Sequence, residues 1–124
     1  MTNEVIIMSE SPIFVKSYDL IKWLLPTTTK YSREYRFSLA LPTQAHMFKM
    51  QQHLVAAAKM GQKREIVEQL RQADVELTML RYKVRLARDL NLLKVGGYEH
   101  VSRLIDEVGR LLGGWMRKNG IGDR

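Results

Sequence analysis

With 124 residues, the chain fits one domain and is long enough to bury a hydrophobic core without metals or disulfides. It has no cysteine, which excludes disulfides and thiolate metal sites and is compatible with a reducing compartment. Its 20 lysines and arginines against 13 aspartates and glutamates give a net charge of +7, which favours a polyanionic partner, nucleic acid first and an acidic protein second.

The hydropathy of the chain argues against a membrane. The opening segment MTNEVIIMSES has no basic start followed by a long apolar run, and no later stretch approaches the roughly 20 apolar residues that cross a bilayer. We therefore expect neither secretion nor a membrane partner, and a cytoplasmic location.

The first predicted helix begins at Ser11 and Pro12, where a serine hydroxyl can cap free amides and proline suits the first turn. Pro26 is expected to kink or end its last turn, and residues 27–32 to form the first connection. Helical spacing predicts one apolar face made of Phe14, Tyr18, Ile21, Leu25 and Thr28.

The second predicted helix contains a proline near its start. Pro42 predicts either a kink or a helix that begins at about Leu41. Gly61 is expected to close the helix in the left-handed conformation. The expected apolar face consists of Phe37, Leu41, Ala45 and Phe48 and continues through Leu54 to Ala58.

The third predicted helix, residues 63–91, has the clearest pattern, because apolar residues alternate by three and four as in a bundle seam. These residues are Ile66, Leu70, Ala73, Leu77, Leu80, Val84 and Ala87. Gly96 and Gly97 are expected to break the chain after it.

The fourth predicted helix repeats this alternation until the glycines at 120 and 122, with Tyr98, Val101, Leu104, Val108, Leu111 and Trp115. Gly109 and the pair Gly113-Gly114 are expected to permit close helix contact. The sequence thus predicts an all-α, up-down-up-down antiparallel four-helix bundle over residues 11–118. Residues 1–10 and 119–124 are expected to be flexible ends.

Residues suited to catalysis are sparse. His46 and His53 lie seven residues apart without a carboxylate at matching spacing, so we interpret them as a surface pair rather than a metal or catalytic site. We find no glycine-rich phosphate loop, nucleophile elbow or pair of carboxylates in an apolar setting. We therefore expect no enzyme, no bound metal and no cofactor.

The aromatic side chains are interpreted mainly as core residues rather than as a base-stacking platform. This applies to Trp23, Trp115, Phe14, Phe37 and Phe48. Tyr31, Tyr35 and Tyr82 are the expected exceptions, because they have charged neighbours.

The distribution of charge is the most informative feature. Residues 15–63 contain Lys16, Lys22, Lys30, Arg33, Arg36, Lys49, Lys59 and Lys63 against Asp19 and Glu34. In the third helix, acids come first and Arg81, Lys83, Arg85 and Arg88 follow. Basic residues there also suit the negative end of a helix dipole, and Arg81 and Arg88 could equally pair across helices, so the pattern alone leaves both interpretations open.

Four segments together resemble a known family: YDLIKWLLP at 18–26, Arg33 with Arg36-Phe37, LRYKVRLA at 80–87 and IDEVGRLLGGW at 105–115. They resemble the accessory variability determinant (Avd) proteins of diversity-generating retroelements. These belong to a wider four-helix-bundle family that includes proteins encoded in intervening sequences of ribosomal RNA genes. The resemblance covers nearly all of residues 11–118, and the last segment is its most specific part.

The resemblance implies a ring-shaped homopentamer of bundles that is not itself catalytic. It would bind the retroelement's reverse transcriptase and its template RNA through a basic surface during mutagenic retrohoming, with RNA, DNA or an RNA/DNA hybrid as the nucleic acid. By matching position, Arg81 and Arg85 are the expected contact residues, accompanied by Lys83 and Arg88. Lys30, Arg33 and Arg36 in the basic connection are weaker candidates.

Three rival functions remain open at this stage. The first is a bundle protein of the intervening-sequence type without a reverse transcriptase partner, which the gene neighbourhood would reveal. The second is a structural oligomer whose charge maintains solubility. The third, a metal-using bundle enzyme, requires inward Glu-x-x-His ligands, which this sequence lacks.

Overall fold

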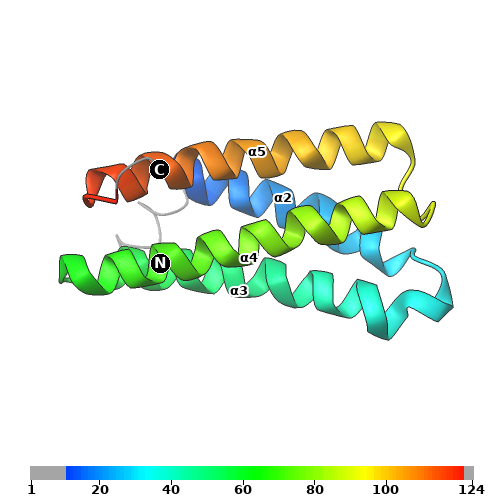
Figure 1. Cartoon of the computed structure of the whole chain (residues 1–124), viewed down its shortest axis with the longest axis horizontal. Helices are drawn as coiled ribbons and strands as arrows, with labels where there is room; N and C mark the ends of the chain where they lie inside the picture. Colours follow the sequence, from blue (N-terminus) through cyan, green and yellow to red (C-terminus); the bar gives the residue numbers. More distant parts are fainter. Residues whose placement is uncertain (1–10, 122–124) are drawn as a thin grey trace.

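The computed structural model describes residues 11–121, which form four long helices and no β-strand. The helices are α2 (Pro12–Thr29), α3 (Leu41–Lys59), α4 (Lys63–Asp89) and α5 (Val95–Lys118). Consecutive helices run in opposite directions, each packs against the next, and α2 packs against α5 (Figure 1). The predicted all-α, up-down-up-down arrangement is therefore confirmed for the described chain.

The core runs along the centre of the bundle and is built mainly from leucine, isoleucine and methionine. Burial of each such side chain contributes about 1.5–3 kcal/mol. The fully buried large side chains include Leu20, Leu24, Met47, Met50, Leu54, Leu70, Leu77, Leu80, Ile105 and Leu112. In α4 the predicted seam is confirmed from Leu70 to Ala87, whereas Ile66, near the start of the helix, is partly buried.

Helix α2 begins at Pro12 as predicted, but the Ser11 hydroxyl does not cap it; the Ser11 carbonyl accepts the first bonds instead. Pro26 does not end the helix, which continues to Thr29. Pro26 cannot donate to the carbonyl four residues earlier, and the following turn is held by threonine hydroxyls that donate to backbone carbonyls. These bonds are Thr27 to Trp23 (2.8 Å), Thr28 to Leu25 (2.7 Å) and Thr29 to Pro26 (2.6 Å).

The predicted apolar face of α2 is confirmed at four of its five residues and wrong at Tyr18. The buried residues are Ile13, Ser17, Leu20, Ile21, Leu24 and Thr28, and Tyr18 is 61% exposed. Apolar residues cover more than half of this helix, so helical spacing allows two neighbouring faces. Ile21 and Thr28 are buried, Phe14 and Leu25 are partly buried against the core at the edge of this face, and Tyr18 is exposed.

The predicted face of α3 is wrong from Phe37 to Phe48 and confirmed at Leu54. Phe37, Leu41 and Phe48 are 76%, 54% and 45% exposed, and Ala45 is exposed as well. Besides Leu54, the buried residues of the helix are Thr43, Met47, Met50 and Ala57, whereas Ala58 is exposed. Thr43 can be buried there because its hydroxyl donates to the Leu39 carbonyl at 2.7 Å.

The chain between α2 and α3 is helical but irregular. A 3₁₀ turn, η1 (Arg33–Tyr35), is followed by a π-helical turn, η2 (Arg36–Ala40), and α3 then begins at Leu41 with Pro42 in its first turn. This is one of the two starts predicted for the helix. Pro42 lacks an N–H, and its ring crowds the Ser38 carbonyl, which explains why the preceding turn is wider than an α-helical one.

The helix ends also correct the sequence interpretation. Gly61 does not adopt a left-handed conformation, and the α3 cap Met60 is extended. The break after α4 occurs at Asn91, whose φ is 61°, and Gly96 and Gly97 lie in the first turn of α5. At the end of α5, Gly120 has a φ of 83° and Ile121 donates to the Met116 carbonyl at 3.0 Å, a Schellman motif that requires a residue tolerant of positive φ.

Several aromatic predictions are confirmed and others are not. Trp23, Trp115 and Phe14 pack against the core, and the rings of Phe14 and Trp115 meet edge to face at 6.2 Å. Exposure of Phe37 and Phe48 contradicts their predicted core role. Tyr31 is 8% exposed and Tyr35 packs against the core, although both have charged neighbours; Tyr82 is exposed as expected.

The predicted domain limits, 11–118 with flexible residues 1–10 and 119–124, stay predictions; residues 1–10 and 122–124 lie outside the described range. No helix between residues 11 and 121 has the length and hydrophobicity needed to cross a membrane.

Candidate functional site

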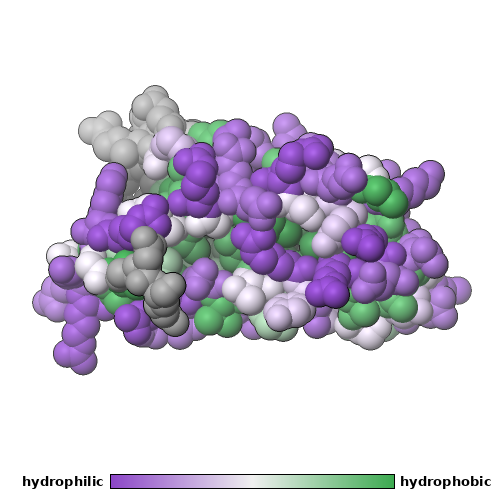
Figure 2. Space-filling view, turned by 45° about the horizontal axis from the view of Figure 1, so that its top comes forward, coloured by the Kyte–Doolittle hydropathy of each residue, from purple (hydrophilic) through white to green (hydrophobic). Residues whose placement is uncertain are grey.

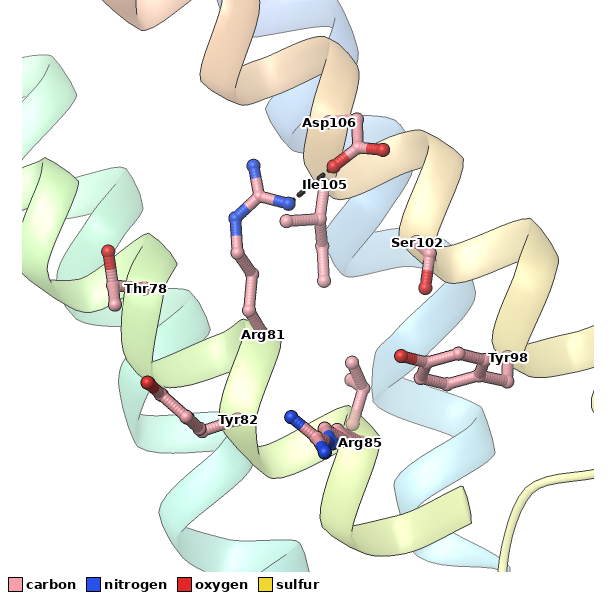
Figure 3. Close-up of a pocket in the computed structure, with 9 residues that line it drawn as sticks. Thr78, Arg81, Tyr82, Arg85, Tyr98, Ser102, Ile105 and Asp106 are labelled. Carbon is pink, nitrogen blue, oxygen red and sulfur yellow. Dashed lines mark hydrogen bonds and ion pairs between the residues drawn. The ribbon is translucent and has the colours of Figure 1, made fainter. Parts of the chain in front are cut away.

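A groove between α4 and α5 contains the two arginines that the sequence put forward most strongly. The groove has a volume of about 460 Å³, and Figure 3 shows it with its lining side chains. Those side chains are Thr78, Arg81, Tyr82, Val84 and Arg85 from α4 and Tyr98, Ser102, Ile105 and Asp106 from α5. We call this feature the α4–α5 groove.

Arg81 crosses the groove to α5. Its guanidinium donates a hydrogen bond to the Asp106 carboxylate, as drawn in Figure 3. The side chains are 44% and 66% exposed, so this ion pair stabilises the fold by at most about 1 kcal/mol. Gly109 makes room for it, because a Cβ at that position would lie 2.8 Å from Nη2 of Arg81. The expected close contact is thus found at Gly109, whereas no atom of another helix lies near a Cβ built at Gly113 or Gly114.

Arg85 lies one helical turn after Arg81 and is exposed in the same groove. It makes no hydrogen bond or ion pair with another residue of the range 11–121. The hydroxyl-bearing side chains of Tyr98 and Ser102 project from α5 into the space it faces (Figure 3). The groove therefore presents a cation beside hydroxyl donors, an arrangement suited to phosphate oxygens.

The other two basic residues of α4 have different environments. The Arg88 guanidinium lies 5.0 Å from the centre of the Tyr98 ring, and its Nε is 3.9 Å from the Asp89 carboxylate. Arg88 therefore interacts across helices, which is one of the two interpretations that the sequence left open. Its guanidinium contacts Tyr98, a residue that lines the groove. Lys83 is half-buried and does not line the groove.

The three basic residues of the first connection lie elsewhere. Lys30, Arg33 and Arg36 are exposed, and Arg36 lines a second pocket of about 360 Å³ between α2 and the η2–α3 segment. Figure 1 places this connection at the same end of the bundle as the turn between α4 and α5. The structure therefore brings the predicted residues to one end but divides them between two sites.

Positive charge also occurs at the opposite end, where Lys63, Arg64, Arg110 and Lys118 are exposed. Figure 2, with the α5 side turned forward, shows mainly hydrophilic residues with small hydrophobic areas between them. The charge of the bundle is spread over its surface, and the groove combines two arginines with hydroxyl-bearing side chains in a concave space.

The histidines are not a surface pair. Nδ1 of His46 lies 2.6 Å from the Glu76 carboxylate, and Nδ1 of His53 lies 2.8 Å from the Gln69 amide oxygen, so both connect α3 to α4. His100 packs against Trp23, with 5.0 Å between ring centres. No group of three or more potential metal-binding side chains is present among residues 11–121.

The sequence analysis did not identify Asp106, the hydrogen-bond acceptor of Arg81, or Tyr98 and Ser102, which line the groove from α5. Asp106 lies within the segment 105–115 that carried the resemblance, yet its contact with Arg81 depends on the register between two helices. Tyr98 and Ser102 stand at the spacing of one helical turn on the same side of α5, a pattern that would have indicated a shared polar edge.

The comparisons with known proteins agree with the resemblance in the sequence. A model of the bAvd-like family matches residues 12–119, from the first residue of α2 to one residue beyond α5. No curated protein matches the chain. The match spans all four helices, the α4–α5 groove and the second pocket. The chain therefore belongs to the bAvd-like family.

Proposed function

We propose that this protein is a non-catalytic accessory subunit of a diversity-generating retroelement, and that it binds the reverse transcriptase and the template RNA through its basic surface. The observation that carries the proposal is the α4–α5 groove, where Arg81 and Arg85 lie beside hydroxyl groups in a chain of the bAvd-like family. Its role is to bring the polymerase and its template together.

The groove supports contacts with phosphates rather than with particular bases. Arg85 has no partner among residues 11–121, and Arg81 is held by an exposed carboxylate that a phosphate can replace at small cost. Each arginine that neutralises a phosphate releases bound counterions, so affinity should fall steeply with salt. No element of the bundle is shaped for reading base edges in a groove of a duplex.

The proposal includes a homo-oligomer, and by family a ring of five copies. The homo-oligomer is supported by the outer face of α4, where Val75, Tyr82 and Leu86 follow each other at spacings of seven and four and are 56%, 62% and 44% exposed. Of these three residues, Tyr82 also lines the edge of the α4–α5 groove. Such a stripe is typical of a helix that packs against a further helix. A closed ring would sum the charge of +7 per chain into one strong field.

The decisive experiment is copurification of the tagged protein with a reverse transcriptase encoded beside it, with and without nuclease and across a series of salt concentrations. A nuclease-resistant complex that weakens with salt is expected. If no complex forms while the protein remains a folded oligomer, an intervening-sequence bundle protein or a purely structural oligomer becomes the better interpretation.

A further inference from the structure

Phe37 is the most exposed large hydrophobic side chain of the described residues, at 76%. It lies in η2, the π-helical turn that leads into α3. The two residues that follow it by two and three positions, Leu39 and Ala40, are buried, so the segment itself is anchored to the core. The phenyl ring is therefore displayed on a fixed backbone rather than on a loose end.

The second pocket lies directly beside this ring, and we call it the Phe37 pocket. Apolar surface comes from Phe37 and Leu41, and polar groups come from Thr28, Arg36 and Gln44. Its volume of about 360 Å³ falls within the range of sites that hold small planar molecules.

The amide of Gln44 is positioned but not fully used. Its Nε2 donates to Oγ1 of Thr28 at 2.9 Å, while the Thr28 hydroxyl donates to the Leu25 carbonyl at 2.7 Å. These bonds fix the direction of the amide. Its carbonyl oxygen and second N–H have no hydrogen-bond partner between residues 11 and 121, so a donor and an acceptor remain at the pocket.

Positive charge lies at the pocket and in the chain segment that leads to it. Arg36 lines the pocket, and Lys30 and Arg33 precede it in the connection between α2 and η2. All three side chains are exposed, and none forms an ion pair with a residue of the described chain. Glu34 is the one acidic residue among positions 30–40. An aromatic face, a free amide and cations at or near one cavity are the groups that bind one unstacked nucleotide: a face for the base, polar atoms for its edge and charge for the phosphates.

We propose that the Phe37 pocket binds an unpaired base of a single-stranded nucleic acid. The base stacks on the Phe37 ring, the Gln44 amide meets its hydrogen-bonding edge, and Arg36 with Arg33 contacts the flanking phosphates. This inference rests on the proposed nucleic-acid binding and adds to it, because the α4–α5 groove holds phosphates of any strand. A base within a duplex is already stacked and paired, so entry into the pocket would first cost a few kcal/mol of unstacking and unpairing, and the pocket therefore favours a single strand.

The test compares binding of a mixed-sequence single-stranded RNA and of the matching blunt duplex by fluorescence anisotropy. Phe37→Ala is expected to weaken single-strand binding about 10-fold and to leave duplex binding unchanged. The slope of affinity against salt should stay the same, because no charge is lost, whereas Arg36→Ala should reduce it by roughly 1. Phe48→Ala, which removes another exposed phenylalanine of the same region outside the pocket, is the matched control and should bind as the wild type does.

A second measurement reads the stacking directly. Phe37→Trp keeps an aromatic face, so it should retain single-strand affinity, and its emission should be quenched when single-stranded RNA binds but not when the duplex binds. Trp23 and Trp115 are present in both proteins and serve as the background.

The outcomes separate the two proposals. If the wild-type protein binds neither RNA, the proposed nucleic-acid function fails. If the wild-type protein binds both RNAs and Phe37→Ala binds the single strand equally well, the proposed base site is wrong while the proposed nucleic-acid function stands. If Phe37→Ala changes the oligomeric state measured by light scattering, this face is an interface between copies and the base site is overturned.

Discussion

Arg81 on α4 and Asp106 on α5 form an ion pair across the opening of the groove proposed to bind nucleic acid. The carboxylate occupies the side of Arg81 that a phosphate oxygen would otherwise take. In the proposed function Asp106 therefore competes with the phosphate for Arg81, and the ion pair determines how much of the positive charge of the groove is available.

Replacement of that carboxylate should strengthen binding. In Asp106→Asn, Arg81 loses its counter-charge, so we expect affinity for RNA to rise several-fold and the salt slope to increase by roughly 1, because one more phosphate is neutralised. Anisotropy titrations at several KCl concentrations measure both quantities. An unchanged affinity and slope would show that Arg81 does not contact phosphate.

Arg85 should carry more of the binding than an arginine elsewhere on the same helix. Arg85→Ala is expected to weaken binding of both single-stranded and duplex RNA while the circular dichroism of the helices stays the same. Arg64→Ala, a change of an exposed arginine near the start of α4, provides the matched comparison. Equal losses in the two variants would mean that overall charge, and not the groove, determines affinity.

Gly109 offers a way to disturb the ion pair without changing any charge. In Gly109→Ala the new Cβ would lie 2.8 Å from the end of the Arg81 side chain, which is flexible and can move away. Alanine is favoured over glycine inside a helix, so the free energy of unfolding should rise by up to about 1 kcal/mol. RNA binding should change in the same direction as in Asp106→Asn. A lower free energy of unfolding in urea denaturation would show that the Arg81 side chain cannot move away from the new Cβ.

The Tyr31 hydroxyl is buried without a hydrogen-bond partner in the described chain. A buried hydroxyl of this kind costs about 1–3 kcal/mol, so Tyr31→Phe should raise the free energy of unfolding, by about 1 kcal/mol. Tyr82→Phe removes a hydroxyl from an exposed tyrosine and should have no effect. If Tyr31→Phe destabilises the protein, the hydroxyl has a partner after all.

The same residue predicts a dependence on alkaline pH. Burial raises the pKa of Tyr31 to about 12 from an ordinary value of 10.0. The unfolded chain therefore loses this proton first as the pH rises, and the stability present below pH 10 should fall by about 2–3 kcal/mol up to pH 12. The difference between the stabilities of the wild type and Tyr31→Phe at each pH isolates the contribution of this hydroxyl. The two proteins should converge in their pH dependence below pH 10.

The accuracy of the sequence interpretation varied with the number of apolar faces that each helix carries. Helix α4 has one dominant stripe from Leu70 to Ala87, and its inward face could be predicted residue by residue. In α3, the stripe with Phe37 and Phe48 looks as regular as the stripe with Met47 and Leu54 that is buried. Spacing cannot choose between two such stripes, because the choice depends on which neighbouring helices are present.

The sequence predicted which basic residues of α4 lie in the groove, but it did not predict which residues they contact. The groove holds Arg81 and Arg85, but the pairing of Arg81 with Asp106 joins residues 25 positions apart and depends on the register of α4 against α5. The Phe37 pocket was missed because a phenylalanine at helical spacing is ordinarily a core residue. Its exposure arises from the irregular η1–η2 segment, which no periodic pattern describes.

The order in which the helices pack around the bundle places the two proposed sites on different pairs of helices. The α4–α5 groove is lined by α4 and α5, and the Phe37 pocket is lined by α2, η2 and α3, so the two share no lining residue. A short oligonucleotide bound at one site leaves the other accessible. With both proposed sites occupied, one copy would hold two separate strand segments, or a strand and a protein, at the same time.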